Sequence, residues 1–86
     1  MNFVVRWKED ALDDLTAIWL NAGSRDRRGI TAAARQADRL LGSDPFGNSE
    51  SREADRRIMF VAPLAVTFRV GSEANRVEVL RVRRFH

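Results

Sequence analysis

Arginine is the residue type with which this chain could do chemistry. A guanidinium group binds a phosphate or a carboxylate through two parallel hydrogen bonds, and its flat face stacks on nucleic-acid bases. Residues 56–86 contain seven arginines: Arg56, Arg57, Arg69, Arg76, Arg81, Arg83 and Arg84. The only histidine, His86, follows them, and an imidazole can act as a general acid or a general base. This combination indicates a surface for phosphate groups or for an acidic protein.

The charge is unevenly distributed along the chain. Residues 1–55 carry 8 basic and 10 acidic side chains, whereas residues 56–86 carry 7 basic and 2 acidic side chains. Such a basic segment favours a nucleic-acid or acidic-protein partner. The alternative is that a GC-rich genome enriches arginine and alanine, and that the arginines are only solvated surface. Their positions on the folded chain decide between the two interpretations.

The basic segment also reads as three consecutive strands. Apolar runs at 58–61 and 64–70 meet at Ala62-Pro63, where Pro63 favours a bend because it has no N–H to donate. A third run at 77–82 follows an expected hairpin loop at 71–75. Alternation separates Ile58, Phe60, Leu64, Val66, Phe68 and Val70 from Met59, Val61, Ala65, Thr67 and Arg69. In the last strand it predicts a shared side for Val77, Val79, Arg81 and Arg83.

The N-terminal half supplies one strand and two helices. Residues 3–7 form a short β-branched and aromatic run, and apolar residues then recur at helical spacing between 11 and 22. Ser24 is a candidate N-cap for a second helix, but Gly29 interrupts this segment, so the helix is expected to start at Ile30 and to end before Pro45. Residues 46–54 are expected to form a loop with Phe46 tucked into the core, to which Trp7 and Trp19 also belong.

These elements predict one α+β domain over residues 1–86. The order is β-α-α-β-β-β, with a helix hairpin packed on a mainly antiparallel sheet. The helices cover one face of this sheet. The other face is only partly apolar, carries arginine, and cannot be buried by so short a chain.

Composition excludes several classes of protein. The chain has no cysteine, so it has no disulfide framework and no cysteine-based metal site. It contains no apolar run long enough for a membrane helix, and its N-terminus does not resemble a signal peptide. No glycine-rich phosphate loop, Ser/His/Asp set or metal-ligand cluster is present in the sequence. We therefore expect a cytoplasmic protein that needs no cofactor and no metal.

Taken together in chain order, several short motifs resemble the RelE/ParE superfamily of toxins from type II toxin–antitoxin systems. The opening motif is Trp7, Ala11, Asp14-Leu15 and Ile18-Trp19, and the second helix contributes Ala34, Ala37-Asp38, Leu40 and Asp44-Pro45. The closing strands contribute 57–61, 63–70 and 77–82. The resemblance covers nearly the whole chain, and it implies the RelE-like fold.

The resemblance implies one of two activities. RelE-like members cleave mRNA in the ribosomal A site, whereas ParE-like members inhibit DNA gyrase without catalysis. Members of both groups are neutralised by an antitoxin protein whose C-terminal segment wraps around the toxin. Neither activity involves a membrane, and both need an open basic sheet surface.

The resemblance also suggests site residues. Arg57 matches an arginine that holds phosphate, and the expected catalytic set is Arg57, Arg81, Arg83 and His86. The expected RNA-binding set is Arg56, Arg69, Arg84 and Phe85, and the general base would be Glu50, Glu53 or Asp55. The chain departs from several nucleases of the family because it has no tyrosine and its single lysine, Lys8, lies far from the closing strands. This departure favours the gyrase alternative.

Overall fold

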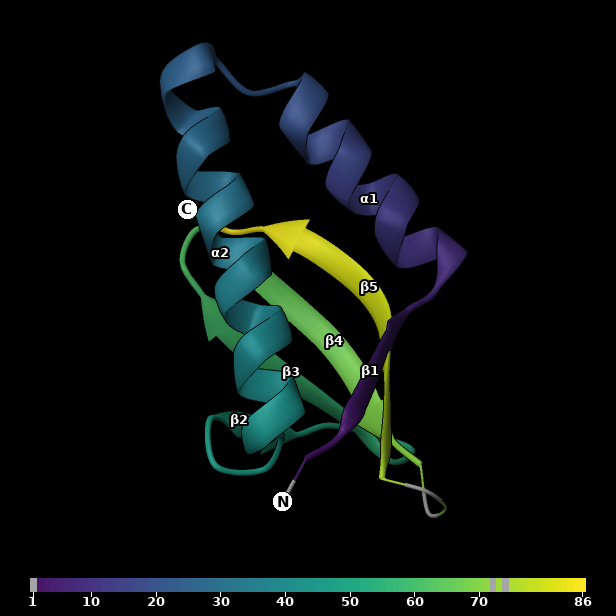
Figure 1. Ribbon diagram of the computed structural model, residues 1–86. Helices are drawn as coiled ribbons and strands as arrows, with labels where there is room; N and C mark the ends of the chain where they lie inside the picture. Colours follow the sequence, from purple (N-terminus) through teal and green to yellow (C-terminus); the bar gives the residue numbers. More distant parts are fainter. Residues whose placement is uncertain (1, 72, 74) are drawn as a thin grey trace.

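The computed structural model describes residues 2–71, 73 and 75–86, and in these the α+β architecture is confirmed (Figure 1). The elements are β1 (Val4–Trp7), α1 (Glu9–Leu20), α2 (Ser24–Ser43), β2 (Ser49–Ser51), β3 (Arg56–Val61), β4 (Leu64–Val70) and β5 (Arg76–Arg84). The expected order gains one short strand, β2, inside the segment expected to be a loop. Part of the expected loop at 71–75, namely Ser72 and Ala74, lies outside the described residues.

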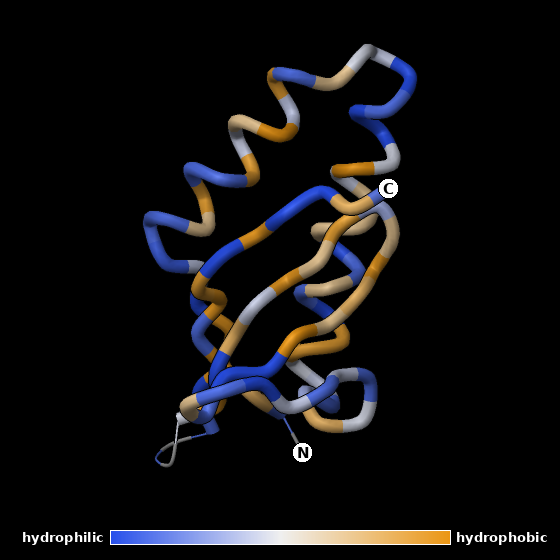
Figure 2. Tube along the Cα trace, turned by 180° about the vertical axis from the view of Figure 1, so that it is seen from behind, coloured by the Kyte–Doolittle hydropathy of each residue, from blue (hydrophilic) through white to orange (hydrophobic). Residues whose placement is uncertain are grey.

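The strands form one sheet in the order β1-β5-β4-β3-β2. β1 pairs with β5 in parallel, and the remaining neighbours are antiparallel. α2 lies across one face, while α1 packs mainly on β5 and diverges from α2 (Figure 1). Figure 2 shows the sheet from behind, with no helix in front of the strands. We call this uncovered side the open face.

The core lies between α2 and the side of the sheet that faces the helices, which we call the covered face. Met59, Val66 and Phe68 from the sheet are fully buried against a helix stripe that includes Ile30 and Leu41. Alanines at the remaining positions of this stripe let the helix approach the strands closely, and burial of this apolar surface is the main stabilising force. The core thus fixes which side of each strand faces inward.

α2 begins earlier than expected. It starts at Ser24 rather than at Ile30, and Gly29 lies inside it. The side chain of Arg27 explains part of this, because its Nε donates to the carbonyl of Trp19 (2.9 Å) at the end of α1. Its guanidinium also lies 4.2 Å from the centre of the Trp19 ring. These contacts with the end of α1 favour a helical conformation before Gly29, although glycine inside a helix costs roughly 1 kcal/mol.

Two aromatic side chains are more exposed than expected. Trp19 is 39% exposed and Phe46 is 52% exposed, so neither is a core residue. Phe46 lies at the edge of Phe3 (6.5 Å between ring centres) and under the guanidinium of Arg57 (5.1 Å). It therefore helps to hold the segment before β3 in place, without entering the core.

A β-bulge reverses the alternation within β5. The register pairs Val79 with Phe68 and Arg81 with Thr67, which leaves Leu80 without a partner on β4. One extra residue on a strand shifts every following side chain to the other face. The expectation that Arg81 and Arg83 share a side with Val77 and Val79 is therefore wrong, and both arginines lie on the open face.

Asp14 of α1 covers the free edge of β5 beyond the end of β1. Its Oδ2 accepts the backbone N–H of Val82 (2.9 Å) and the Nε–H of Arg81 (2.8 Å), and its Oδ1 accepts from Arg81 Nη2 (3.0 Å). An unpaired strand edge otherwise leaves backbone groups available to other chains. Asp14 thus joins α1, the sheet edge and one open-face arginine.

Replacing Asp14 with alanine is expected to lower the free energy of unfolding by about 1–3 kcal/mol, because a charged acceptor of three hydrogen bonds is lost. Chemical denaturation followed by circular dichroism measures this change. Asp13→Ala is the matched control, since Asp13 is exposed and should change stability by less than about 0.5 kcal/mol. Equal losses in both variants would contradict the role assigned to Asp14.

The same contact predicts a pH dependence. Hydrogen bonding to Arg81 lowers the pKa of Asp14 from 3.8, so this stabilisation is present above the unfolded-state pKa. It is lost as the pH falls through the lower folded-state pKa. The stability difference between the unmodified chain and Asp14→Asn should therefore be constant near neutral pH and shrink below about pH 4. Denaturation curves at several pH values test this, and a difference unchanged at pH 2 would contradict it.

Candidate nucleic-acid interface

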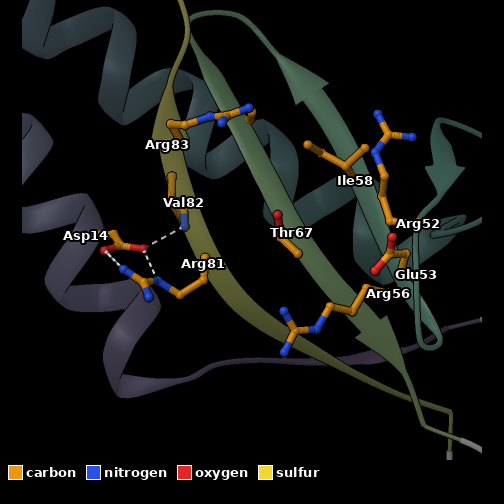
Figure 3. Close-up of a pocket in the computed structure, with 10 residues that line it drawn as sticks. Asp14, Arg52, Glu53, Arg56, Ile58, Thr67, Arg81, Val82 and Arg83 are labelled. Atoms are coloured by element: carbon orange, nitrogen blue, oxygen red, sulfur yellow. Dashed lines mark hydrogen bonds and ion pairs between the residues drawn. The ribbon is translucent and has the colours of Figure 1, made fainter.

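A cleft of about 650 Å³ lies on the open face between α1, β5, β4 and the start of β3. Its lining consists of Asp14, Arg52, Glu53, Arg56, Ile58, Ala65, Thr67, Arg81, Val82 and Arg83 (Figure 3). Four guanidinium groups and two carboxylates therefore surround a small apolar floor. Such an arrangement attracts anions, and the apolar floor suits a flat ligand.

Two of these arginines are available for a ligand. In Figure 3, Arg56 of β3 and Arg83 of β5 extend over β4 from opposite edges, with Thr67 between them. Within the described part of the chain, neither side chain makes an ion pair or a side-chain hydrogen bond. Each guanidinium therefore retains its full set of donors for phosphate oxygens.

Arg81 is held in a fixed position by Asp14. Both of its hydrogen bonds go to this carboxylate, although 63% of its side chain is exposed. The hydrogen bond from Arg81 is the largest cause of the lowered pKa of Asp14, and partial burial acts in the opposite direction. The pKa of Arg81 is raised by the same bond. The pair stays ionised at neutral pH, and Arg81 offers a ligand only its remaining donors.

Arg57 lies on the other side of the sheet. It is paired with Phe68 across β3 and β4, and directly opposed residues point to the same face, which here is the covered one. Its guanidinium donates to the hydroxyls of Ser49 (2.8 Å) and Ser51 (2.9 Å). The expected grouping of Arg57 with Arg81 and Arg83 on one phosphate is therefore wrong, because the sheet separates them.

Two arginines of the expected RNA-binding set already bind groups within the chain. Arg84 points to the covered face, where it donates to Asp26 of α2 (3.2 Å) and to the carbonyl of His86 (2.9 Å). Arg69 lies on the open face but donates to Glu78 (2.8 Å), and it does not line the cleft. Their main contribution is to connect elements of the fold.

Phe85 and His86 lie at the far end of the open face. The Phe85 N–H donates to the carbonyl of Pro63 (3.0 Å), and its ring contacts Phe60 edge-on at 5.3 Å between centres. The His86 ring lies 6.1 Å from the Phe85 ring. Phe85 and His86 therefore follow the end of β5, the strand that carries Arg83, and Phe85 lies beside Phe60 of β3.

The three expected acids are in different situations. Glu53 lines the cleft, Glu50 is paired with Arg52 (3.2 Å), and Asp55 does not line the cleft. Glu53 precedes β3, whereas His86 lies beyond its other end, so the length of the strand separates them. Six residues of strand span roughly 17–20 Å. Glu53 and His86 therefore cannot act as base and acid on the same phosphate.

The sequence did not single out Thr67 and Phe60 as site residues, and Asp14 entered only as part of the opening motif of the family resemblance. Alternation correctly separated Thr67 from Val66 and Phe68, but it grouped Ile58 and Phe60 with them, whereas these two residues lie opposite Thr67 and Ala65 on the open face. Nothing in the sequence links Asp14 to Arg81, which is 67 positions away. Among the described residues, no group of three or more histidine, cysteine, aspartate or glutamate side chains could hold a metal ion. None of the described helices has the length and apolar character needed to cross a membrane.

No protein-family model and no curated protein sequence matches the chain. Solved structures do match it over nearly its full length. The RelBE2 toxin–antitoxin complex of Mycobacterium tuberculosis has a TM-score of 0.77 at 22% identity, covering 98% of this chain and 99% of the other. For the chromosomal ParDE system of P. aeruginosa the TM-score is 0.76 at 21% identity, with coverage of 98% and 97%.

The intact RelBE complex of E. coli gives a TM-score of 0.60 at 19% identity, with 95% of both chains covered. RelE-type and ParE-type structures therefore match this chain equally well, and the backbone does not separate the two groups. At these identities the likeness establishes the fold. The chain has the α+β fold of the RelE/ParE toxins of toxin–antitoxin systems.

Proposed function

We propose that this chain is the growth-inhibiting toxin of a type II toxin–antitoxin system and acts in the cytoplasm, with an antitoxin protein as its normal partner. The fold shared with proteins of RelBE and ParDE systems supports this proposal. So does the surface of α1, where Leu12, Trp19 and Leu20 are exposed. Apolar side chains gathered on one surface suit contact with another protein.

The activity we propose is metal-independent cleavage of mRNA bound to the ribosome. The observation that carries it is the open-face cleft with Arg56 and Arg83 on either side of Thr67. These two guanidinium groups would bind successive phosphates of a single strand. Arg81 would donate from a position fixed by Asp14. Arg57 has no part in this site, because it lies on the covered face.

In such a cleavage, the ribose 2′ oxygen forms a bond to phosphorus and the bond from phosphorus to O5′ breaks. His86 would accept the proton of the 2′-OH, and the leaving O5′ oxygen would take a proton from water. Arg83, which is nearer to His86 along the chain than Arg81, would stabilise the negative charge that develops on the phosphoryl oxygens. This assignment uses a single protein group for proton transfer.

A second candidate activity is inhibition of DNA gyrase without catalysis. The separation of Glu53 from His86 favours it, because no acid–base pair is available at one phosphate. The chain also has no tyrosine or cysteine, and Lys8 does not line the cleft. In this case the open face would bind an acidic surface of a protein, and the same arginines would make the contacts.

Arg83→Ala and Arg56→Ala are each expected to weaken binding of a short single-stranded RNA and to flatten its salt dependence. Each lost phosphate contact should reduce the slope of log K against log salt by about 0.7. Fluorescence anisotropy over a range of salt concentrations measures both effects. Arg57→Ala is the matched control: it removes the same charge from the opposite face.

The Arg57→Ala variant should therefore keep the slope of the unmodified chain. Equal reductions in all three variants would mean that only net charge matters, and the cleft would be rejected as the binding site. A thermal melt of each variant verifies folding, because Arg57 holds Ser49 and Ser51.

Expression of the chain without an antitoxin is expected to stop incorporation of labelled methionine before that of labelled thymidine, with new mRNA 5′ ends. The His86→Ala variant should leave translation running, because proton transfer is lost while the arginines remain. If thymidine incorporation stops first and DNA-damage signalling begins, the endonuclease proposal fails and the gyrase alternative is supported.

A further inference from the structure

An aromatic pair, Phe60 and Phe85, is exposed at one end of the open face. Phe60 is 47% exposed and Phe85 is 45% exposed, although phenylalanine is usually buried and a small domain gains stability from burying it. Their rings meet edge to face, at 83° and 5.3 Å between centres. An edge-to-face pair leaves at least one broad ring face open to a third flat group.

The pair adjoins an unoccupied arginine. Phe60 is opposite Ala65 on β4, and Ala65 is opposite Arg83 on β5, so the three side chains form one row across the open face. Ala65 is only 2% exposed, although no helix covers this face. Larger side chains around it therefore shield Ala65 from solvent.

We infer that Phe60, with Phe85 beside it, is a stacking site for one nucleobase of the RNA strand whose phosphate binds Arg83. This inference rests on the proposed function. It adds to that function a site that contacts the base itself, whereas the arginines contact only the phosphate backbone.

The spacing fits a single nucleotide. Two strand separations place Phe60 and Arg83 roughly 10 Å apart at the backbone. The Arg83 side chain extends across β4 and so shortens this distance at the guanidinium (Figure 3). A phosphate on Arg83 would then leave its sugar over Ala65 and its base at the Phe60 ring. Aromatic rings bind every base through its π-face, so the site selects for the presence of a base without reading its sequence.

A purely structural role for the pair explains less. A ring that served only to cover Ala65 would gain most by complete burial, and an aliphatic side chain would do equally well. The availability of ring faces beside an unpaired guanidinium distinguishes this location from Phe46. That ring is also exposed, but Arg57 already lies over it.

The test compares two labelled probes of equal charge, a hexamer of riboadenylate and an abasic ribose-phosphate hexamer. The unmodified chain should bind the riboadenylate more tightly. Phe60→Leu, which keeps an apolar side chain and removes the ring, should weaken riboadenylate binding by about fivefold or more. It should leave binding of the abasic probe within about twofold, and Phe60→Trp should restore riboadenylate binding. Thermal melts verify that each variant folds.

The outcomes separate the stacking site from the proposed function. If Phe60→Leu weakens binding of both probes equally, or of neither, while Arg83→Ala weakens both, the stacking site is refuted and the phosphate-binding cleft stands. If the unmodified chain binds neither probe at low salt, RNA binding by the open face is refuted, and the stacking site falls with it.

Discussion

A single unpaired residue, Leu80, determines which face of the sheet carries Arg81 and Arg83. Before this bulge, Val77 and Val79 point into the core, and strict alternation would bury the two arginines beside them. Burial of two unpaired guanidinium groups would cost far more than a small domain can offset. The bulge removes this conflict, because the strand returns Val82 to the core and turns both arginines outward. The basic character of the open face depends on this shift of one residue.

Most arginines of the closing segment hold the fold together. Arg57 binds the β2 serines, Arg69 binds Glu78, Arg81 binds Asp14 and Arg84 binds Asp26. These contacts link segments that the small core alone connects weakly. Of the other three arginines, Arg56 and Arg83 line the cleft and Arg76 does not. The phosphate contacts proposed for the cleft therefore depend mainly on Arg56 and Arg83, and the net charge of the segment overstates them. Neither interpretation of the arginine-rich segment, a surface for a nucleic-acid or acidic-protein partner or solvated surface residues, therefore describes all seven arginines.

Four of the five strands, both helices and the open face could be predicted from the sequence, because hydrophobic periodicity and Pro63 mark them locally, whereas the polar strand β2 carries no such periodicity. The start of α2 and the place of Phe46 could not, because Arg27 and Arg57 decide them through contacts with distant residues. The site was predicted less well for the same reason. Whether Arg57 or Arg56 faces the ligand depends on the register with Phe68. The Leu80 bulge shows in the sequence only as a change of phase, from Val77 and Val79 to Val82, and assuming strict alternation across it put Arg81 and Arg83 on the wrong face.

The proposed function depends on binding of single-stranded RNA by the open face. Backbone amide chemical shifts, followed by NMR during titration with a short RNA, locate the binding surface. We expect perturbations that cluster at Ile58, Ala65, Thr67 and Arg83, with little change along the outer side of α2. Perturbations concentrated on α1 and α2, with the amides of β4 unchanged, would contradict it.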